Sequence, residues 1–214
     1  MTSISAFDLD HTLVQSNTSF LFFRHLMRRG SFSASSLFRA LLIFFEYRFC
    51  DLGLQQLHNK AFHILLKGKK FSLIEEEMRQ FLAADFYRFF YLPSFSRLRR
   101  AQHEGHYTVI LSSSPSFIVG PIAEYLGVTH WQSSEYEIDQ NGRLKRVKFV
   151  LSGEEKARYL AEFARVRQVG FDRVVAYSDS LLDLPFLLAA GKAIVVNPSK
   201  GLRQISKRKS WEII

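Results

Sequence analysis

The segment FDLDHTL at residues 7–13 constrains the fold of this chain more than any other stretch. It continues an apolar run from residue 4 that is typical of a buried strand, and it places Asp8 and Asp10 two residues apart. Because side chains alternate along a strand, both carboxylates should leave its end on the same side. Two acids crowded there repel each other unless they share a proton or a cation lies between them. Taken alone, the pair is explained equally well by a solvated turn.

A second acidic cluster far downstream changes that balance. The segment SDSLLD at residues 178–183 follows an apolar, β-branched run at residues 174–176. Parallel sheets bind ligands beyond the carboxyl ends of their strands, so two acidic clusters in this position indicate an active site. The sequence therefore favours an α/β fold built on a parallel sheet.

Two further pieces lie between the acidic clusters. A buried-strand pattern at residues 107–111 ends in SSSP, where hydroxyls and free backbone N–H groups suit a phosphate oxygen; Ser112 and Ser113 are the candidates. Ser114 is equally well explained as the N-cap of a helix at residues 116–126. Lys156 lies early in a helical pattern, where a lysine is usually a solvated charge.

In this order, the pieces resemble the motifs of the haloacid dehalogenase superfamily of phosphohydrolases, in particular its phosphoserine-phosphatase-like branch. DLDHT is similar to the first motif, D-x-D-x-T, and SDSLLDLP to the fourth, G-D-S-x-x-D-x-P. Ser112 falls at the Ser or Thr of the second motif, and Lys156 at the lysine of the third. The resemblance implies a Rossmann-like, parallel-sheet core at residues 1–14 and 94–214, with an α-helical cap inserted at residues 15–93.

The resemblance also implies a phosphatase that works through an aspartyl-phosphate. Asp8 would be the nucleophile and Asp10 the general acid and base. Ser112 and Lys156 would hold the phosphoryl oxygens, the first as a directional donor and the second as a point charge.

The implied cofactor is Mg²⁺, a hard cation that binds phosphate through oxygen ligands. Its ligands would be Asp8, the backbone carbonyl of Asp10, and Asp179. Asp183 would orient Lys156 or a metal-bound water. Thr12 is expected either to contact substrate or to hold the loop with its hydroxyl.

The sequence departs from the family pattern at two positions. Ser178 stands where the family usually has Gly, which leaves the backbone less conformational freedom. Asn17 stands where phosphoserine phosphatases have a Glu that pairs with the ammonium group of the substrate. We therefore predict that Asn17, together with Ser113, contacts a substrate other than phosphoserine.

The implied cap contains almost no strand signal. Helical patterns cover residues 19–29, 34–49, 54–66 and 73–90. In the resembling family this lid selects the leaving group. Its many aromatic residues are best explained as packing, but the apolar LLIFF segment at residues 41–45, flanked by arginines, also suits a membrane surface or a hydrophobic substrate.

The rest of the core has clearer patterns. Strands at residues 130–138 and 143–147 are joined by DQNG, a strong hairpin signal. A helix is expected at residues 181–190 and the last strand at residues 192–196. We interpret the basic segment at residues 207–209 as part of a solvated tail.

Charge and cysteine content bound the partners and the compartment. The net charge of +9 raises nucleic acid as a partner, but the cations are dispersed and no nucleic-acid-binding motif accompanies them. The same charge would steer phosphate esters or favour peripheral contact with an anionic membrane. The single cysteine, Cys50, excludes an internal disulfide; without a signal-peptide pattern, we expect a cytoplasmic protein. Oligomeric state leaves no signal in the sequence.

The expected activity is thus hydrolysis of a small phosphomonoester. Asn17, the aromatic cap and the positive charge favour a hydrophobic or lipid-like ester, such as phosphatidylglycerophosphate, over a small metabolite such as histidinol phosphate. The alternative is a catalytically silent phosphate-binding or regulatory module on the same fold. A degenerate binder would be expected to have lost at least one member of the set Asp8, Asp10, Lys156 and Asp179.

Overall fold

The computed structural model describes residues 2–30, 35, 38–39, 42–43, 53–84 and 86–214. The helix expected at residues 34–49 and the LLIFF segment lie largely outside these ranges, and Cys50 lies wholly outside them. No helix within the described ranges is long and apolar enough to cross a bilayer.

The described residues form one mostly parallel sheet in the order β4-β3-β2-β1-β5-β6-β7, in which only β4 runs antiparallel to its neighbour. The strands are β1 (Ile4–Phe7), β2 (Tyr107–Pro115), β3 (His130–Ile138), β4 (Leu144–Phe149), β5 (Val174–Ser178), β6 (Lys192–Val195) and β7 (Glu212–Ile213). The predicted α/β class is therefore confirmed.

Strand β1 lies at the centre of the sheet. It pairs with β2 on one side and β5 on the other, so that Phe7 lies opposite both Ile110 and Tyr177. All four residues of β1 are buried, as a strand covered on both faces requires. This pairing brings the segments that follow three distant strands to one edge of the sheet.

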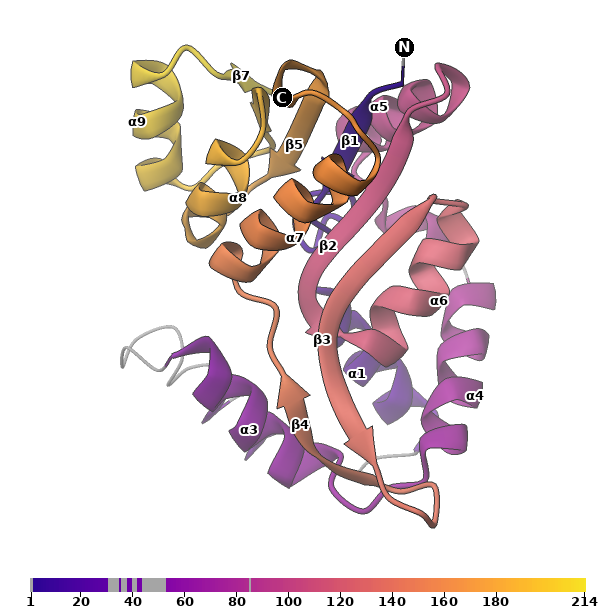
Figure 1. Cartoon of the computed structure of the whole chain (residues 1–214). Helices are drawn as coiled ribbons and strands as arrows, with labels where there is room; N and C mark the ends of the chain where they lie inside the picture. Colours follow the sequence, from indigo (N-terminus) through magenta and orange to yellow (C-terminus); the bar gives the residue numbers. More distant parts are fainter. Residues whose placement is uncertain (1, 31–34, 36–37, 40–41, 44–52, 85) are drawn as a thin grey trace.

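Helices cover both faces of the sheet (Figure 1). They are α1 (Thr18–Arg28), α3 (Leu54–Leu65), α4 (Phe71–Ala83), α5 (Leu92–His103), α6 (Ser116–Leu126), α7 (Gly153–Val166), α8 (Leu184–Leu188) and α9 (Lys200–Arg208), with short 3₁₀ helices η1 (Phe86–Phe89), η2 (Phe171–Arg173) and η3 (Leu181–Asp183). Apolar residues of α7, α8 and α9 pack on one face, and those of α5 and α6 on the other.

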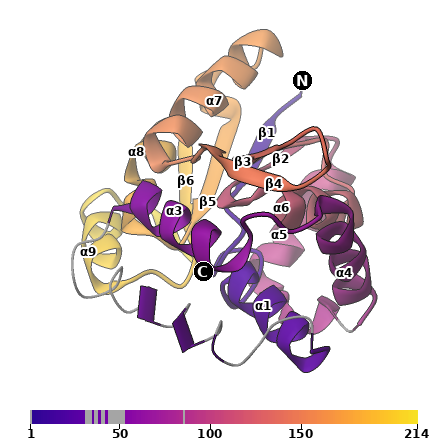
Figure 2. The same cartoon turned by 90° about the horizontal axis from the view of Figure 1, so that it is seen from below.

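Helices α1, α3 and α4 lie toward the carboxyl end of the parallel strands, in the lower half of Figure 1 and nearest the viewer in Figure 2. Phe62 of α3 and Met78 of α4 share one apolar cluster with Ile118 and Ile122 of α6. The helices therefore pack directly on the sheet domain. The boundaries of a cap at residues 15 and 93 stay a prediction.

Two predicted helices differ in the structure. The helix expected over residues 73–90 ends at Ala83, and the separate turn η1 places Phe86 fully in the core. The helix expected over residues 181–190 is divided into η3 and α8, because Pro185 lies in the first turn of α8 and Asp183 turns its side chain inward before it.

The expectation of a tail at residues 207–209 is wrong, whereas the expectation that these residues are solvated is confirmed. Helix α9 buries Leu202 and Ser206, and the chain then adds β7 to the sheet beside β6. Hydrogen bonds from Ile214 N to Val195 O (2.9 Å) and from Asn197 N to Ile214 O (2.9 Å) hold that edge. The three basic side chains are exposed, as expected, but they project from an ordered helix.

The hairpin predicted from DQNG is confirmed. Asp139 Oδ1 accepts hydrogen bonds from the backbone N–H groups of Asn141 and Arg143, both at 2.9 Å. Gly142 adopts a φ of 71°, in the left-handed region that glycine enters without strain. The turn therefore links β3 and β4 at the sequence position predicted for it.

Candidate active site

Asp8 lies directly after the central strand. Its backbone N–H donates to the carbonyl of Tyr177 at 2.9 Å, which continues the β1–β5 pairing by one residue. Ser178 is the last residue of β5, and Ser112 lies in β2 two residues beyond Ile110, which pairs with Phe7. The structure thus brings the first, second and fourth motifs together at the carboxyl edge of the sheet.

Lys156 joins Asp8 to Asp183. Its ammonium donates to Asp8 Oδ1 at 2.7 Å and to Asp183 Oδ2 at 2.8 Å. The residues Lys156, Asp8 and Asp183 are 2%, 5% and 4% exposed, so this is a buried triad and not a solvated lysine on a helix surface. No other described side chain donates to the Asp8 carboxylate, which leaves its second oxygen available to attack.

The start of α7 fixes the position of Lys156. Ser152 caps the helix by accepting a hydrogen bond from Glu155 N at 3.4 Å. At Gly153, a β-carbon would collide with the carbonyl oxygen of Leu182. The helix therefore approaches the fourth motif closely enough for Lys156, one turn later, to reach both carboxylates.

The charges in this triad influence one another. Burial raises the pKa of Asp8 well above its usual range; the Lys156 ammonium opposes this shift, and the nearby Asp183 and Asp179 add to it. Burial alone would lower the pKa of Lys156, but the carboxylates of Asp183 and Asp8 outweigh it and raise that pKa. Lys156 is therefore a permanent cation beside the predicted nucleophile.

Ser178, the departure from the family glycine, has a role in this geometry. Its hydroxyl donates to Asp183 Oδ2 at 2.7 Å and accepts from the backbone N–H of Ser180 at 3.2 Å. A glycine could make neither contact. Ser178 therefore supplies Asp183 with a second donor besides Lys156.

Thr12 and Asp179 form a second pair. The Thr12 hydroxyl donates to Asp179 Oδ1 at 3.2 Å and accepts from Asp179 N at 3.1 Å. Thr12 is fully buried, and the preceding His11 has a φ of 57°, which turns the loop back on itself. Burial raises the pKa of Asp179 to about 6, while His11 lowers it.

These residues suit Mg²⁺. Burial raises the pKa of both Asp8 and Asp179, and the negative charge of Asp179 raises the pKa of Asp8 further. A cation between the two carboxylates would relieve this repulsion. Within the described residues, no group of three or more His, Cys, Asp or Glu side chains is arranged to hold a metal. Two carboxylates and a backbone carbonyl nevertheless fit Mg²⁺, which usually keeps several waters.

Asp10 turns toward the start of α1. Its Oδ1 accepts from Thr18 N at 2.8 Å and Thr18 Oγ1 at 2.6 Å, and its Oδ2 from Asn17 Nδ2 at 3.0 Å and Ser114 Oγ at 2.7 Å. Ser114 is not the N-cap of α6, which is Pro115. Thr18 and the role of Ser114 were missed by sequence reasoning, because nothing local links them to Asp10.

The serines expected to follow a strand at residues 107–111 lie inside β2, which continues to Pro115, and they divide between two environments. Ser112 is fully buried, and its hydroxyl oxygen accepts from Ser114 N at 3.2 Å, which leaves its proton free to donate. Ser113 is half-buried, and its carbonyl accepts from Ser134 Oγ at 2.6 Å. Ser112 is therefore oriented by the backbone of β2 itself.

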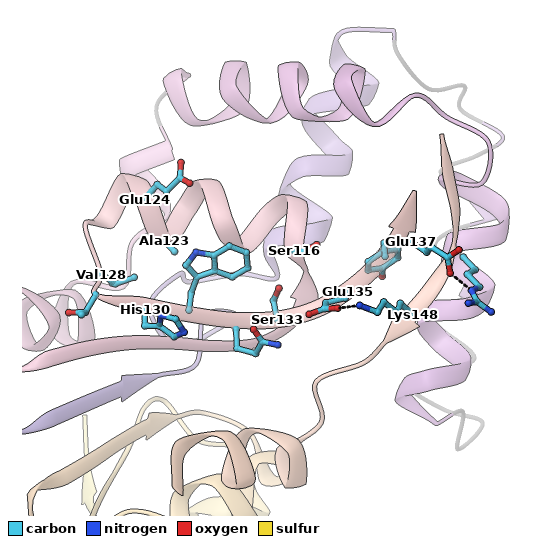
Figure 3. Close-up of a pocket in the computed structure, with 14 residues that line it drawn as sticks. Ser116, Ala123, Glu124, Val128, His130, Ser133, Glu135, Glu137 and Lys148 are labelled. Atoms are coloured by element: carbon cyan, nitrogen blue, oxygen red, sulfur yellow. Dashed lines mark hydrogen bonds and ion pairs between the residues drawn. The ribbon is translucent and has the colours of Figure 1, made fainter. Parts of the chain in front are cut away.

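A separate hollow of about 870 Å³ lies between α6 and the β3–β4 hairpin (Figure 3). Its walls include Trp131 and the ion pair of Glu135 with Lys148 at 2.9 Å. None of the predicted site residues lines it. This hollow is therefore distinct from the motif cluster.

The fold and this cluster agree with the comparison to known families. Residues 6–188 match the family described as haloacid dehalogenase-like hydrolase, and the chain belongs to that family. The predicted family and its hydrolase class are therefore confirmed.

Three curated relatives indicate the range of the family around this chain. A histidinol-phosphatase of Neisseria meningitidis is 26% identical, with 100% of this chain and 99% of that protein covered. Phosphoserine phosphatase SerB1 of Mycobacterium tuberculosis is 27% identical, with 100% and 70% covered. A probable phosphatase of M. tuberculosis is 38% identical over 110 residues, and the match spans 51% of this chain but only 38% of that longer protein.

Solved structures support the fold. A protein of unknown function from Bordetella pertussis Tohama I superposes with a TM-score of 0.86 at 22% identity, covering 100% of this chain and 99% of its own. A substrate-bound phosphoserine phosphatase superposes with a TM-score of 0.71 at 18% identity, covering 100% and 93%. The predicted Rossmann-like architecture is therefore the one that these proteins share.

Proposed function

We propose that this protein is a Mg²⁺-dependent phosphomonoester hydrolase that works through an aspartyl-phosphate on Asp8. The observation that carries the proposal is the buried contact of Lys156 with Asp8, which joins residues 148 positions apart. A buried cation on one carboxylate oxygen, with no described side chain donating to the other, suits an in-line attack on a phosphate. The phosphatase relatives support the same reaction class.

The chemistry can be divided among the residues of the chain. Asp8 attacks phosphorus while Asp10 gives a proton to the departing alkoxide; Asp10 then takes a proton from the water that releases phosphate from Asp8. Lys156 and the Ser112 hydroxyl hold the phosphoryl oxygens. Asp8, Asp179 and the backbone carbonyl of Asp10 would hold Mg²⁺, which supplies positive charge against the phosphate.

The substrate is proposed as a small phosphomonoester other than phosphoserine. The Asn17 amide carries no charge that could pair with an ammonium group. Its oxygen accepts a hydrogen bond from Phe20 N–H (2.9 Å), and its nitrogen donates one to Asp10 (3.0 Å). Histidinol phosphate is favoured by the similarity to the histidinol-phosphatase of Neisseria meningitidis, 99% of which aligns with this chain. A lipid-like ester is favoured by the exposed Leu181 and Leu182 in the fourth motif.

Leu181 also lies close to the first turn of the basic helix α9, since its Cδ2 is 3.4 Å from where a β-carbon of Gly201 would be. Exposed leucines beside cations suit the surface of an anionic membrane. Peripheral membrane contact and a cytoplasmic location therefore stay proposals that accompany the lipid-like substrate.

The test is phosphate release with and without Mg²⁺ across phosphoserine, histidinol phosphate, sugar phosphates, nucleotides, an aryl phosphate and phosphatidylglycerophosphate in mixed micelles. Asp8→Asn serves as the blank, because it keeps the shape of the side chain and removes the nucleophile. We expect Mg²⁺-dependent release that the variant lacks. Release by Asp8→Asn at the wild-type rate would overturn the mechanism, and binding of phosphate without any turnover would favour the silent module.

A further inference from the structure

The carboxylate of Asp10 has all its acceptor positions occupied. A carboxylate offers about four lone-pair sites, and Asp10 receives four hydrogen bonds: two from Thr18, one from Asn17 and one from Ser114. Among the described residues, the carboxylate of Asp8, two residues earlier, receives a hydrogen bond from Lys156 alone. The general acid and base of the proposed reaction is therefore the more tightly held of the two carboxylates.

The two oxygens of Asp10 are held differently. Oδ1 is bound by the backbone N–H and the hydroxyl of one fully buried residue, Thr18, at 2.8 and 2.6 Å. Oδ2 is bound by two side chains, of which Asn17 is half-buried and makes the longest of the four bonds, 3.0 Å. A leaving-group oxygen can therefore compete for Oδ2 far more easily than for Oδ1.

The donors also connect two parts of the fold. Asn17 is the N-cap of α1, and Thr18 is its first residue, whereas Ser114 lies near the end of β2 in the sheet. The hydroxyls of Thr18 and Ser114 lie 3.3 Å apart, so the donors contact one another as well as Asp10. The orientation of Asp10 is therefore tied to the first turn of α1.

We propose that Thr18, Asn17 and Ser114 are positioning residues for Asp10, an inference that rests on the proposed function. Thr18 holds Oδ1 of Asp10 in place, and Oδ2 is the oxygen that transfers the proton. In the free enzyme Asn17 and Ser114 donate hydrogen bonds to Oδ2. In turnover the leaving-group oxygen replaces Asn17 at Oδ2. Before this step Oδ2 takes up a proton from water. That proton passes to the leaving oxygen as its bond to phosphorus breaks and the bond from Asp8 to phosphorus forms, and the carboxylate then returns to its donors.

The test compares two substrates in one enzyme. An alkyl phosphate needs a proton on its leaving oxygen, whereas p-nitrophenyl phosphate releases a weak base that needs little help. We expect Thr18→Val to lower kcat/KM for the best alkyl ester of the panel about tenfold or more, with KM nearly unchanged, and to lower kcat/KM for the aryl ester less than about threefold. Thr18→Ser, which keeps the hydroxyl, should have a kcat/KM for the alkyl ester close to that of the wild type.

Ser114→Ala should likewise lower kcat/KM more for the alkyl ester than for the aryl ester. Ser206→Ala provides the matched control. Ser206 has a fully buried hydroxyl that donates to Leu202 O at 2.8 Å in α9. Its removal should leave kcat/KM unchanged for both esters. Thermal unfolding of each variant separates folding from positioning.

The outcomes separate the two proposals. A wild-type enzyme without turnover on any ester would refute the proposed function. A wild-type enzyme that is active, with Thr18→Val equally impaired on both esters or on neither, would refute the positioning role alone. The positioning role would also be refuted if Thr18→Ser were as impaired as Thr18→Val in kcat/KM for the alkyl ester.

Discussion

Lys156 donates a 2.8 Å hydrogen bond to Asp183, a residue 27 positions later on a different element, and so holds the fourth motif against helix α7. The same ammonium reaches Asp8, so one cation stabilises two buried carboxylates. A buried charge without a partner is costly, and each member of the triad therefore depends on the others. This dependence makes the site testable by single substitutions.

Asp183→Asn keeps the shape of the side chain and removes its charge. Lys156 would then be held by Asp8 alone, and we expect kcat to fall about 10- to 100-fold, as is usual when a partner of a catalytic group is lost. Ser178→Ala, which removes one hydrogen bond to Asp183 but no charge, should lose less. Steady-state kinetics with the best substrate of the panel checks both, and an Asp183→Asn enzyme with wild-type kcat would contradict the role of the triad.

Thr12→Val removes the hydroxyl that contacts Asp179 twice and keeps the volume of the side chain. If Asp179 holds Mg²⁺, its orientation should loosen, and the Mg²⁺ concentration for half-maximal activity should rise about 10- to 100-fold. Thr12→Ser is the control, since it retains the hydroxyl. Calorimetric titration with Mg²⁺ provides a second measurement, and equal affinities in the three proteins would remove Thr12 from the metal site.

Gly153→Ala should disturb both stability and activity. The new methyl group meets the carbonyl oxygen of Leu182, so α7 must move away from the fourth motif. Such overpacking costs about 1–3 kcal/mol in the free energy of unfolding, and the displaced Lys156 should lower kcat. Denaturant unfolding and kinetics measure the two effects.

Gly201→Ala is the matched control for that substitution. It lies in α9, where the added methyl would meet Leu181 at an ordinary contact distance of 3.4 Å. We expect a change of under about 1 kcal/mol, in the stabilising direction, because alanine favours a helix. If Gly153→Ala proved as harmless as Gly201→Ala, the close approach of α7 would not matter.

His58 should make the fold sensitive to acid. Burial lowers its pKa to about 4, from an ordinary value near 6.5, and its Nδ1 lies 2.7 Å from the Tyr136 hydroxyl. The unfolded chain therefore binds a proton more readily than the folded one, so stability is full above about pH 6.5 and is lost as pH falls toward 4. Over that interval His58 alone should lower the free energy of unfolding by up to about 3 kcal/mol.

Urea unfolding at several pH values compares the wild type with His58→Gln. The variant has no group that titrates at this position, so its stability should fall less steeply between pH 6.5 and 4. Parallel curves for the two proteins would show that His58 is as easily protonated when folded as when unfolded.

Local patterns were sufficient where a strand and its chemistry are adjacent in sequence. The apolar run before Asp8 and the run before Asp179 predicted β1 and β5, and the structure places both carboxyl ends together. The hairpin turn was equally local, because Gly142 and Asp139 act within four residues.

Contacts between distant segments left no local signal. Thr18 and Ser114 reach Asp10 from positions 8 and 104 residues away, and only the folded sheet brings them together. Apolar spacing continues past Ala83, so the pattern did not reveal that the helix ends there. Strand β7 has two residues, which is too short for any periodicity to be recognised.

The central position of β1 has a consequence for how the protein acquires its activity. The strand is made early, but its neighbours β2 and β5 begin about 100 and 170 residues later, at Tyr107 and Val174. A growing chain that ends before β5 leaves one edge of β1 open, and an unpaired edge invites association with other chains. Such long-range pairing also slows folding. We therefore expect synthesis to yield no active fragment: the nucleophile meets its lysine and its second acidic cluster only when the sheet closes around it.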